Sequence, residues 1–234
     1  MDFNVAVYGT VEILPNVTLY LTETLRNTWI IIGLLTLFAI FVRIKLNSFT
    51  EVPRGFQNFI ELAIDAFNNF VRGTAGKELT YLGGWFFAVF MFVAVSNIIG
   101  LVPGMRPPTA DWTATLPLAV VSFLMIQGLA FYYHPKDHAK GFFEPIFIFF
   151  PLNVLGEIAK IVSLSFRLFG NVLGGMILLT LIYAMTPALV QFIVPVVLHA
   201  YFDFASGLLQ AYVFVVLSLA FISAAANAGE PSEA

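Results

Sequence analysis

The chain has 234 residues, of which 59% are hydrophobic and 11% charged, and its formal net charge is −3. A mean hydropathy of +0.90 excludes an ordinary water-soluble domain, in which about a quarter of the residues are charged. The lack of cysteine excludes disulfides, thiolate metal sites and cysteine nucleophiles. The composition predicts an all-α polytopic membrane protein.

Residues 1–27 are predicted to form a short polar segment on the outer side of the membrane. Asp2, Glu12 and Glu23 stand where a cleavable signal peptide would carry basic residues, and the first apolar run starts only near Thr28. We therefore expect this segment to stay attached to the chain.

An apolar run predicts a first membrane span over residues 28–45, which closes with Arg43 and Lys45. Over residues 52–74, apolar side chains recur at helical spacing with polar ones opposite, a pattern typical of an amphipathic helix at the membrane interface. The next predicted elements are a second span at 82–103, a third span at 114–133 and a loop at 134–143.

Two apolar tracts, 144–185 and 188–226, lead to a polar tail at 227–234. A helix of about 40 residues is about 60 Å long, twice the thickness of the hydrocarbon core. Either each tract breaks into two pieces, or both are long helices that lie strongly tilted. With one crossing each, the chain has about five crossings.

The positions of Lys and Arg predict the orientation, because cytoplasmic loops are enriched in them. If the N-terminus is on the outer side and the tail is cytoplasmic, most of the basic residues that are not in a span lie in the cytoplasm. They are Arg43, Lys45, Arg54, Arg72, Lys77, Lys136 and Lys140. Arg26 and Arg106 then fall outside.

Each long tract carries one polar stripe at helical spacing. In the first tract it consists of Glu157, Lys160, Leu164, Arg167 and Asn171, and in the second of His199, Asp203, Ser206 and Gln210. Lipid cannot satisfy such groups, so we expect the stripes to face each other or a water-filled cavity.

Arg167 is the residue that most needs an explanation. An Arg in an apolar span costs between a few and more than ten kcal/mol. No carboxylate lies three or four residues away along the helix. Its predicted partner is either Asp203 or a carboxylate of another subunit.

Most of the polar residues in the two stripes also have a structural interpretation. Glu157 and Lys160 can neutralise each other at i, i+3. Serine hydroxyls, including that of Ser206, can bond back to their own helix. His199, Asn171 and Gln210 can serve helix packing through hydrogen bonds, and Gly174-Gly175 permits close approach of another backbone.

His134 and His138 with Asp137 have a spacing that could hold a metal, but the loop around them favours solvated side chains. The chain contains no P-loop, zinc-protease or serine-hydrolase motif, so no nucleotide or hydrolase chemistry of its own is predicted.

The segment S-L-S-F-R-L-F-G-N at residues 163–171 resembles the signature of subunit a of F-type ATP synthases, the membrane-embedded stator of a rotary motor. Three further segments resemble the same family in the same order. They are V-P-R-G-F-Q-N-F-I-E, S-N-I-I-G-L-V-P followed by P-T-A-D, and Q-A-Y-V-F-V-V-L-S beginning at Gln210.

The resemblance implies that Arg167 faces the carboxylate of a rotating c-subunit ring, with Asn171 and Gln210 beside it. It implies two long tilted helices against the ring. The implied partners are the c-ring, the peripheral-stalk b subunits, the rest of the synthase and membrane lipid, with no nucleic acid. It implies no cofactor and no catalytic or metal site, with H⁺ or Na⁺ as the transported ion, in a bacterial plasma membrane.

The sequence departs from the family at one position. Many members carry a carboxylate nine residues after the Arg, where this chain has Met176; others carry His or an acid seven residues before the Gln, where this chain has Asp203. We expect Asp203 to take over the proton relay. Our hypothesis is that Asp203, His199, Ser206 and Gln210 line one half-channel, with Glu157 or Lys160 near the other.

A secondary transporter that binds an anionic substrate through its intramembrane Arg is the alternative. Such transporters show internal repeats with paired broken helices, and the two long tracts share no motif. An intramembrane enzyme would need a nucleophile with a base, and no such constellation is found in the sequence.

Overall fold

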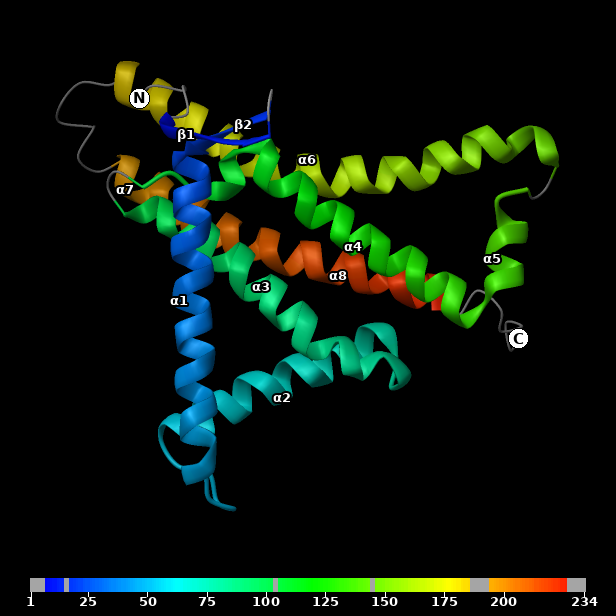
Figure 1. Ribbon diagram of the computed structural model, residues 1–234. Helices are drawn as coiled ribbons and strands as arrows, with labels where there is room; N and C mark the ends of the chain where they lie inside the picture. The colour runs from blue at the N-terminus through cyan, green and yellow to red at the C-terminus, as the bar shows by residue number, and fades with distance from the viewer. Residues whose placement is uncertain (1–6, 15–16, 103–104, 144–145, 186–193, 227–234) are drawn as a thin grey trace. The chain divides into compact units, whose positions relative to one another are not determined.

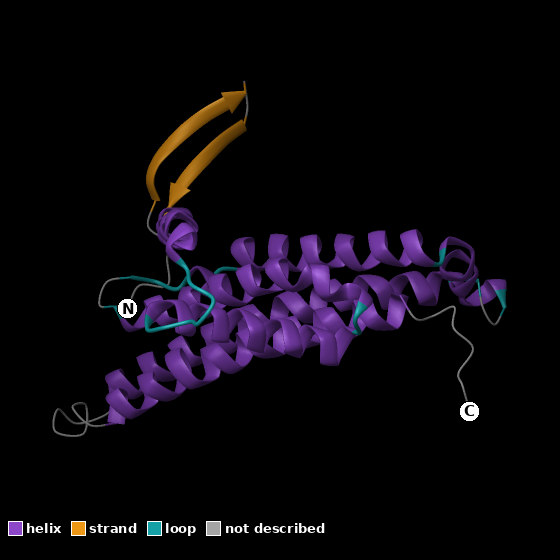
Figure 2. Cartoon of the chain, turned by 90° about the horizontal axis from the view of Figure 1, so that it is seen from below, coloured by secondary structure: helices purple, strands orange, loops and turns teal. Residues whose placement is uncertain are grey.

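The computed structural model describes residues 7–14, 17–102, 105–143, 146–185 and 194–226, and these are almost entirely helical (Figures 1 and 2). Five of the described helical segments are long and apolar enough to cross a membrane. They are Glu23–Ser48, Glu78–Leu101, Trp112–Tyr133, Phe147–Met185 and Val197–Ala226. The prediction of an all-α polytopic membrane protein is therefore confirmed.

A β-hairpin precedes the first span, within the segment that the sequence predicts only as polar. Its antiparallel strands are β1 (Val7–Leu14) and β2 (Val17–Thr22), the strands drawn in Figure 2. The β-branched and aromatic residues of V-T-L-Y-L-T favour extended backbone, a local signal that the sequence analysis does not use. Residues 1–6 lie outside the described part.

Helix α1 (Glu23–Lys45) begins where Thr22 caps it, because the hydroxyl of Thr22 accepts a hydrogen bond from the Leu25 N–H at 3.3 Å. Glu23 in its first turn, and Arg43 and Lys45 in its last, each oppose the partial charge of the helix end. The helix thus starts five residues before the predicted apolar span.

Helix α2 (Phe56–Ala75) is the amphipathic helix. Gly55 and Gly76 flank it with positive φ values of 54° and 91°, a backbone conformation that glycine adopts without steric cost. The next two long helices in the chain are α3 (Gly83–Ile98), preceded by the 3-10 helix Glu78–Leu82, and α4 (Trp112–Tyr133). A short helix, α5 (Pro135–Gly141), occupies the predicted loop 134–143, and proline stands at its start.

The first long tract forms one helix, α6 (Phe150–Met185), of 36 residues. The second consists of α7 (Val194–His199), the π-helix Ala200–Ser206 and α8 (Gly207–Ala226). The predicted break at 186–187, the first residues of the second tract (188–193) and the tail at 227–234 lie outside the described residues, and the tilt of the helices in a membrane stays a prediction.

The chain divides into two compact units made of alternating segments. The first unit comprises Met1–Ser48, Met91–Thr115 and Arg167–Ala211, and the second comprises Phe49–Phe90, Leu116–Phe166 and Tyr212–Ala234.

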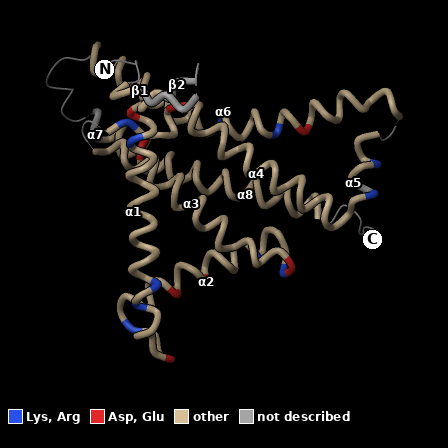
Figure 3. Tube along the Cα trace, viewed as in Figure 1, with Lys and Arg blue, Asp and Glu red and all other residues tan. Residues whose placement is uncertain are grey.

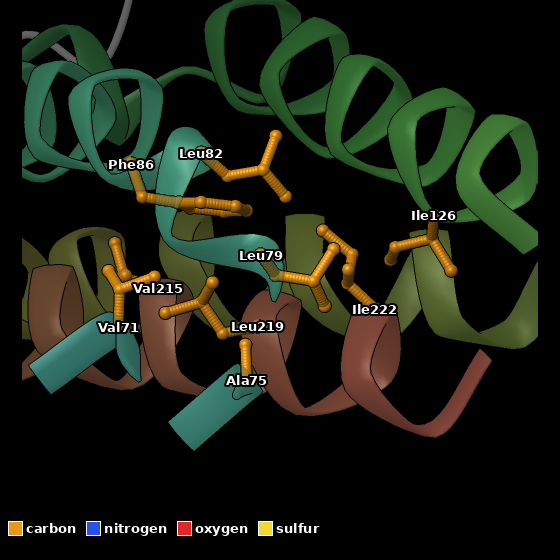
Figure 4. Packing of buried hydrophobic residues seen from close by; sticks show 9 residues of the cluster. All are labelled: Val71, Ala75, Leu79, Leu82, Phe86, Ile126, Val215, Leu219 and Ile222. Carbon is orange, nitrogen blue, oxygen red and sulfur yellow. The ribbon is translucent and has the colours of Figure 1, made fainter. Parts of the chain in front are cut away.

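A buried apolar cluster holds the second unit together (Figure 4). Its members are Val71, Ala75, Leu79, Leu82, Phe86, Ile126, Val215, Leu219 and Ile222. They come from α2, the 3-10 helix, α3, α4 and α8. In lipid the hydrophobic effect does not drive helices together, so the close packing of these side chains supplies the association energy.

Buried polar contacts hold the first unit together near the start of α1. The hydroxyl of Thr24 donates to Asp111 Oδ2 at 2.9 Å, and Asn27 Nδ2 donates to the backbone oxygen of Arg106 at 2.8 Å. Thr24 and Asn27 are both buried. The two bonds fix the segment 105–111 against α1.

Candidate functional site

Charged residues in α6 stand out because they lie away from the ends of the helix (Figure 3). They are Glu157, Lys160 and Arg167, the residues around which the sequence predicts the site. Each belongs to one of the two units: Arg167 to the first, Glu157 and Lys160 to the second.

Arg167 is exposed. Among the described residues, no side chain forms a hydrogen bond or ion pair with its guanidinium group. On the same side of α6, Gly170 and Gly174 are exposed too, and a Cβ added at either would meet no atom within 4 Å. Two of the exposed positions that follow Arg167 on this side of the helix therefore carry no side chain.

Asp203, one of the two predicted partners of Arg167, is paired with another residue. His199 Nδ1 lies 2.6 Å from Asp203 Oδ2. His199 Nε2 lies 3.5 Å from the hydroxyl of Tyr183 on α6. The acid, the imidazole and the phenol thus form one polar series within the first unit. The sequence analysis missed Tyr183, because an aromatic residue near a helix end is typical of the membrane interface and does not by itself indicate a polar contact.

The π-helix Ala200–Ser206 contains Asp203. Single π-turns inside α-helices are rare and are frequent at functional sites. The hydroxyl of Ser206 donates to Asn171 Oδ1 at 3.0 Å, so the two polar stripes do meet at this point. Ser206 therefore bonds across to another helix.

The side chain of Phe202 in the π-helix packs against the backbone of α6 at Gly175. A Cβ added at Gly175 would lie 3.0 Å from Phe202 Cδ1, which is tighter than nine in ten real Cβ contacts. Gly175 is buried while its neighbour Gly174 is exposed. The packing role predicted for the Gly174-Gly175 pair therefore rests on Gly175.

Asn97 anchors the end of the π-helix from α3. Its Nδ2 donates to the backbone oxygen of Gly207 at 2.9 Å, and its Oδ1 accepts from the Thr109 hydroxyl at 2.6 Å. A Cβ at Gly207 would come within 2.6 Å of Asn97 Cβ, so only glycine fits there. The segments S-N-I-I-G and P-T-A-D thus support the site, a role that their sequence alone does not reveal.

Gly100 lets the chain after α3 pack closely against Pro107 and Asp203. A Cβ at Gly100 would lie 2.8 Å from Pro107 Cγ and 3.7 Å from Asp203 Cγ.

Gln210 is buried, and among the described residues its Nε2 has no hydrogen-bond partner. A buried amide nitrogen without a partner is costly.

Glu157 and Lys160 form an ion pair in the second unit. Lys160 Nζ lies 2.6 Å from Glu157 Oε1 and 5.4 Å from the centre of the Phe221 ring. The other carboxylate oxygen, Oε2, accepts from Gln127 Nε2 at 2.7 Å. The predicted mutual pair is therefore present, and α4 adds a third member to it.

His138 does not behave as the solvated loop residue that the sequence favours. Its Nε2 lies 2.7 Å from Gln127 Oε1, and its ring packs edge-on against Phe131 and Phe142. The short helix α5 turns this side chain onto α4. In the described part of the chain, no group of three metal-binding side chains occurs, and the side chain of Asp137 lies outside that part.

Comparison with known proteins identifies the family. The family model described as "ATP synthase A chain" matches residues 26–223. The subunit a of ATP synthase from Desulfosudis oleivorans is 33% identical over 206 residues, 85% of each chain. That from Moorella thermoacetica is 34% identical over 208 residues, 86% of this chain and 89% of the relative.

The name of a third relative specifies an ion, whereas the names of the first two do not. The protein from Propionigenium modestum named "ATP synthase subunit a, sodium ion specific" is 32% identical over 222 residues, 86% of this chain and 73% of the relative. These similarities agree with the motifs around Arg167 and with the five membrane-length helices. The chain belongs to the ATP synthase A chain family and is a subunit a of an ATP synthase.

Proposed function

We propose that Arg167 faces the carboxylates of a rotating c-subunit ring, from which it releases the transported ion. The observation that carries the proposal is an exposed Arg on an apolar helix that has no partner among the described residues. A charge in this setting costs several kcal/mol unless it is satisfied. A partner that arrives and leaves with each step of a rotor accounts for the cost.

The electrostatics of the ring explain the role. A ring carboxylate must be neutral while it faces lipid, because an ion buried in hydrocarbon is strongly disfavoured. Opposite Arg167 the ionised form is favoured instead, so the bound ion leaves there. The fixed positive charge also repels a cation that would pass directly between two half-channels. Ions must then travel on the ring, and their gradient becomes rotation.

The surface of α6 around Arg167 suits a moving partner. Gly170 and Gly174 add no side chain to the exposed surface that follows Arg167 along the helix. Small residues let two helices approach closely in a membrane. A ring helix can therefore bring its carboxylate near the guanidinium group and move on.

One half-channel in this proposal contains Asp203, His199, Ser206 and Gln210, with Tyr183 as a further member. The 2.6 Å contact between His199 and Asp203 joins two groups that can exchange a proton. Asp203 takes the relay role that Met176 cannot serve, since a thioether does not titrate. The half-channel opens on the outer side, where the hairpin and residues 105–111 lie in the proposed orientation.

The second half-channel opens to the cytoplasm near Glu157 and Lys160, which follow the cytoplasmic loop in the chain. We propose H⁺ as the transported ion, because a His–Asp pair is suited to proton exchange, whereas Na⁺ prefers an all-oxygen ligand set. The proposed partners are the c-ring and the peripheral-stalk b subunits, in a bacterial plasma membrane.

Replacement of Arg167 tests the proposal. In the Arg167→Ala variant of the complete ATP synthase, reconstituted in sodium-free buffer, we expect no ATP synthesis from a proton gradient and no ATP-driven proton pumping, with assembly retained. Arg72→Ala, in the last turn of α2, is the matched control and should keep both activities. Coupled pumping by Arg167→Ala near the wild-type rate would contradict the proposal.

A further inference from the structure

A chain of hydrogen-bonded side chains runs from α5 to α6 within the second unit. His138 on α5 contacts Gln127 on α4, and Gln127 contacts Glu157 on α6, both at 2.7 Å. Lys160 completes the chain at 2.6 Å. His138 and Gln127 have no part in the half-channels described above.

The donors and acceptors along this chain have a definite direction. Gln127 Nε2 donates to the Glu157 carboxylate, so the other end of the same amide, Oε1, is an acceptor. His138 Nε2 must then carry a proton to form its contact with Oε1. Both the neutral imidazole with its proton on Nε2 and the doubly protonated imidazolium satisfy this bond.

Glu157 receives a donor on each of its oxygens, Lys160 on Oε1 and Gln127 on Oε2. Neither donor can accept a hydrogen bond, so this pattern fits the ionised carboxylate. A protonated Glu157 would need an acceptor in place of one donor. Gln127 can provide it by turning its amide by half a turn, while Lys160 keeps the Phe221 ring as a second partner.

We propose that His138 exchanges protons with cytoplasmic water and passes them through Gln127 to Glu157, as the outermost step of the cytoplasmic half-channel. In this step the Nε2–H bond of the imidazolium breaks as an O–H bond forms on Gln127 Oε1, and a Gln127 Nε2–H bond breaks as an O–H bond forms on Glu157 Oε2. The proton on Gln127 Oε1 then moves to Gln127 Nε2 through a water molecule, which restores the amide. The positive charge of His138 and the negative charge of Glu157 disappear together. The turned amide then donates from Nε2 to the unprotonated His138 Nε2 and accepts the new hydroxyl proton of Glu157.

The surroundings of His138 suit this role, which rests on the proposed function of the subunit. The imidazole is half-buried, so one part meets the Phe131 and Phe142 rings while another part stays accessible. Histidine is the side chain that exchanges protons near neutral pH. Among the described side chains, the charged groups closest to it in the chain are those of Lys136 and Lys140 on its own helix, and Glu157 and Lys160 are connected to it through Gln127.

The substitution His138→Gln separates the relay from a purely structural link. The amide of the new side chain can still donate to Gln127 Oε1, but it cannot carry and release a proton. A general acid or base contributes roughly 10²–10⁴-fold to a rate; water can replace part of this at a half-buried site. We expect about tenfold slower ATP-driven proton pumping and ATP synthesis by the reconstituted complex.

His134→Gln is the matched control. His134 is the N-cap residue just before the same short helix, and among the described residues its side chain has no hydrogen-bond partner. We expect this variant to pump at the wild-type rate. If His138→Gln also pumps at that rate, the relay is excluded.

Rescue by a diffusible base adds a result that a structural role would not produce. We expect millimolar imidazole to restore part of the pumping rate of His138→Ala, and not to change that of His134→Ala. Slow His138 variants without rescue would overturn the proposal in favour of a structural link. If His138→Ala does not assemble, the variant Gln127→Met can be tested instead, because methionine has about the size of glutamine but cannot continue the hydrogen-bonded chain. Pumping by Gln127→Met at the wild-type rate would also overturn the proposal.

The Arg167→Ala variant shows which claim fails. If Arg167→Ala keeps coupled transport, the proposed function itself is wrong. If Arg167→Ala is uncoupled while His138→Gln behaves as wild type, only the relay through Gln127 is wrong.

Discussion

Arg167 and Asp203 have opposite charges and belong to the same unit, yet they do not form an ion pair. Asp203 lies against His199 instead, which leaves Arg167 available for a carboxylate of another subunit. The distinction matters for function, because a permanent ion pair would hold Arg167 neutralised and could not release an ion from a ring. The arrangement of single side chains thus favours the second of the two partners that the sequence allows.

The variant Asp203→Asn tests the proposed outer half-channel. Asparagine keeps the size of the side chain and can still bond to His199, but it cannot take up and release a proton. We expect proton conduction and ATP synthesis to slow by about tenfold or more, measured as dye-monitored proton flux in proteoliposomes. Asp65→Asn, at an exposed position of α2, should conduct at the wild-type rate. An unchanged rate for Asp203→Asn would remove this residue from the pathway.

The helices that bear the site show what sequence periodicity can predict. Steps of three and four residues correctly place Asn171 and Ser206 on faces that meet. The contact of Asn97 with Gly207 joins residues 110 positions apart and depends on how α3 packs, so no local pattern reveals it. The π-helix is equally hidden, because no local pattern in A-Y-F-D-F-A-S distinguishes it from an α-helix.

The adjacent glycines of α6 give a paired prediction at this scale. Leucine at position 175 must displace Phe202, so we expect Gly175→Leu to reduce the amount of assembled subunit in the membrane several-fold. Leucine at position 174 meets open space in this chain but would stand in the path of the ring. We therefore expect Gly174→Leu to assemble normally and to synthesise ATP slowly. Equal assembly and equal activity of both variants would show that neither surface is close-packed.

Membership of the subunit a family and five membrane-length helices make the molecule a multi-pass membrane subunit. Composition and the order of motifs were sufficient for this conclusion. They were not sufficient for the hairpin of β1 and β2 or for the chain of contacts through His138, since both depend on contacts that hydropathy does not record. The orientation in the membrane rests on the distribution of Lys and Arg alone.

Single cysteines can test that orientation cleanly, because the chain has no cysteine of its own. Lys136 on α5 and Thr113 at the start of α4 are both exposed. We expect a membrane-impermeant maleimide to label Thr113→Cys in intact cells and Lys136→Cys only in inverted membranes. The opposite pattern would reverse the assignment of the two half-channels.

The central claim, that Arg167 faces the ring, is tested most directly by disulfide cross-linking. Gly170→Cys places a thiol one turn from Arg167 in open space, and Leu168→Cys places one on the buried side of the same helix. With a second cysteine one turn from the ring carboxylate, oxidation should cross-link Gly170→Cys to a single c subunit and stop ATP synthesis until the disulfide is reduced. The Leu168→Cys control should not cross-link. Absence of a cross-link from Gly170→Cys in an assembled, active complex would contradict the account.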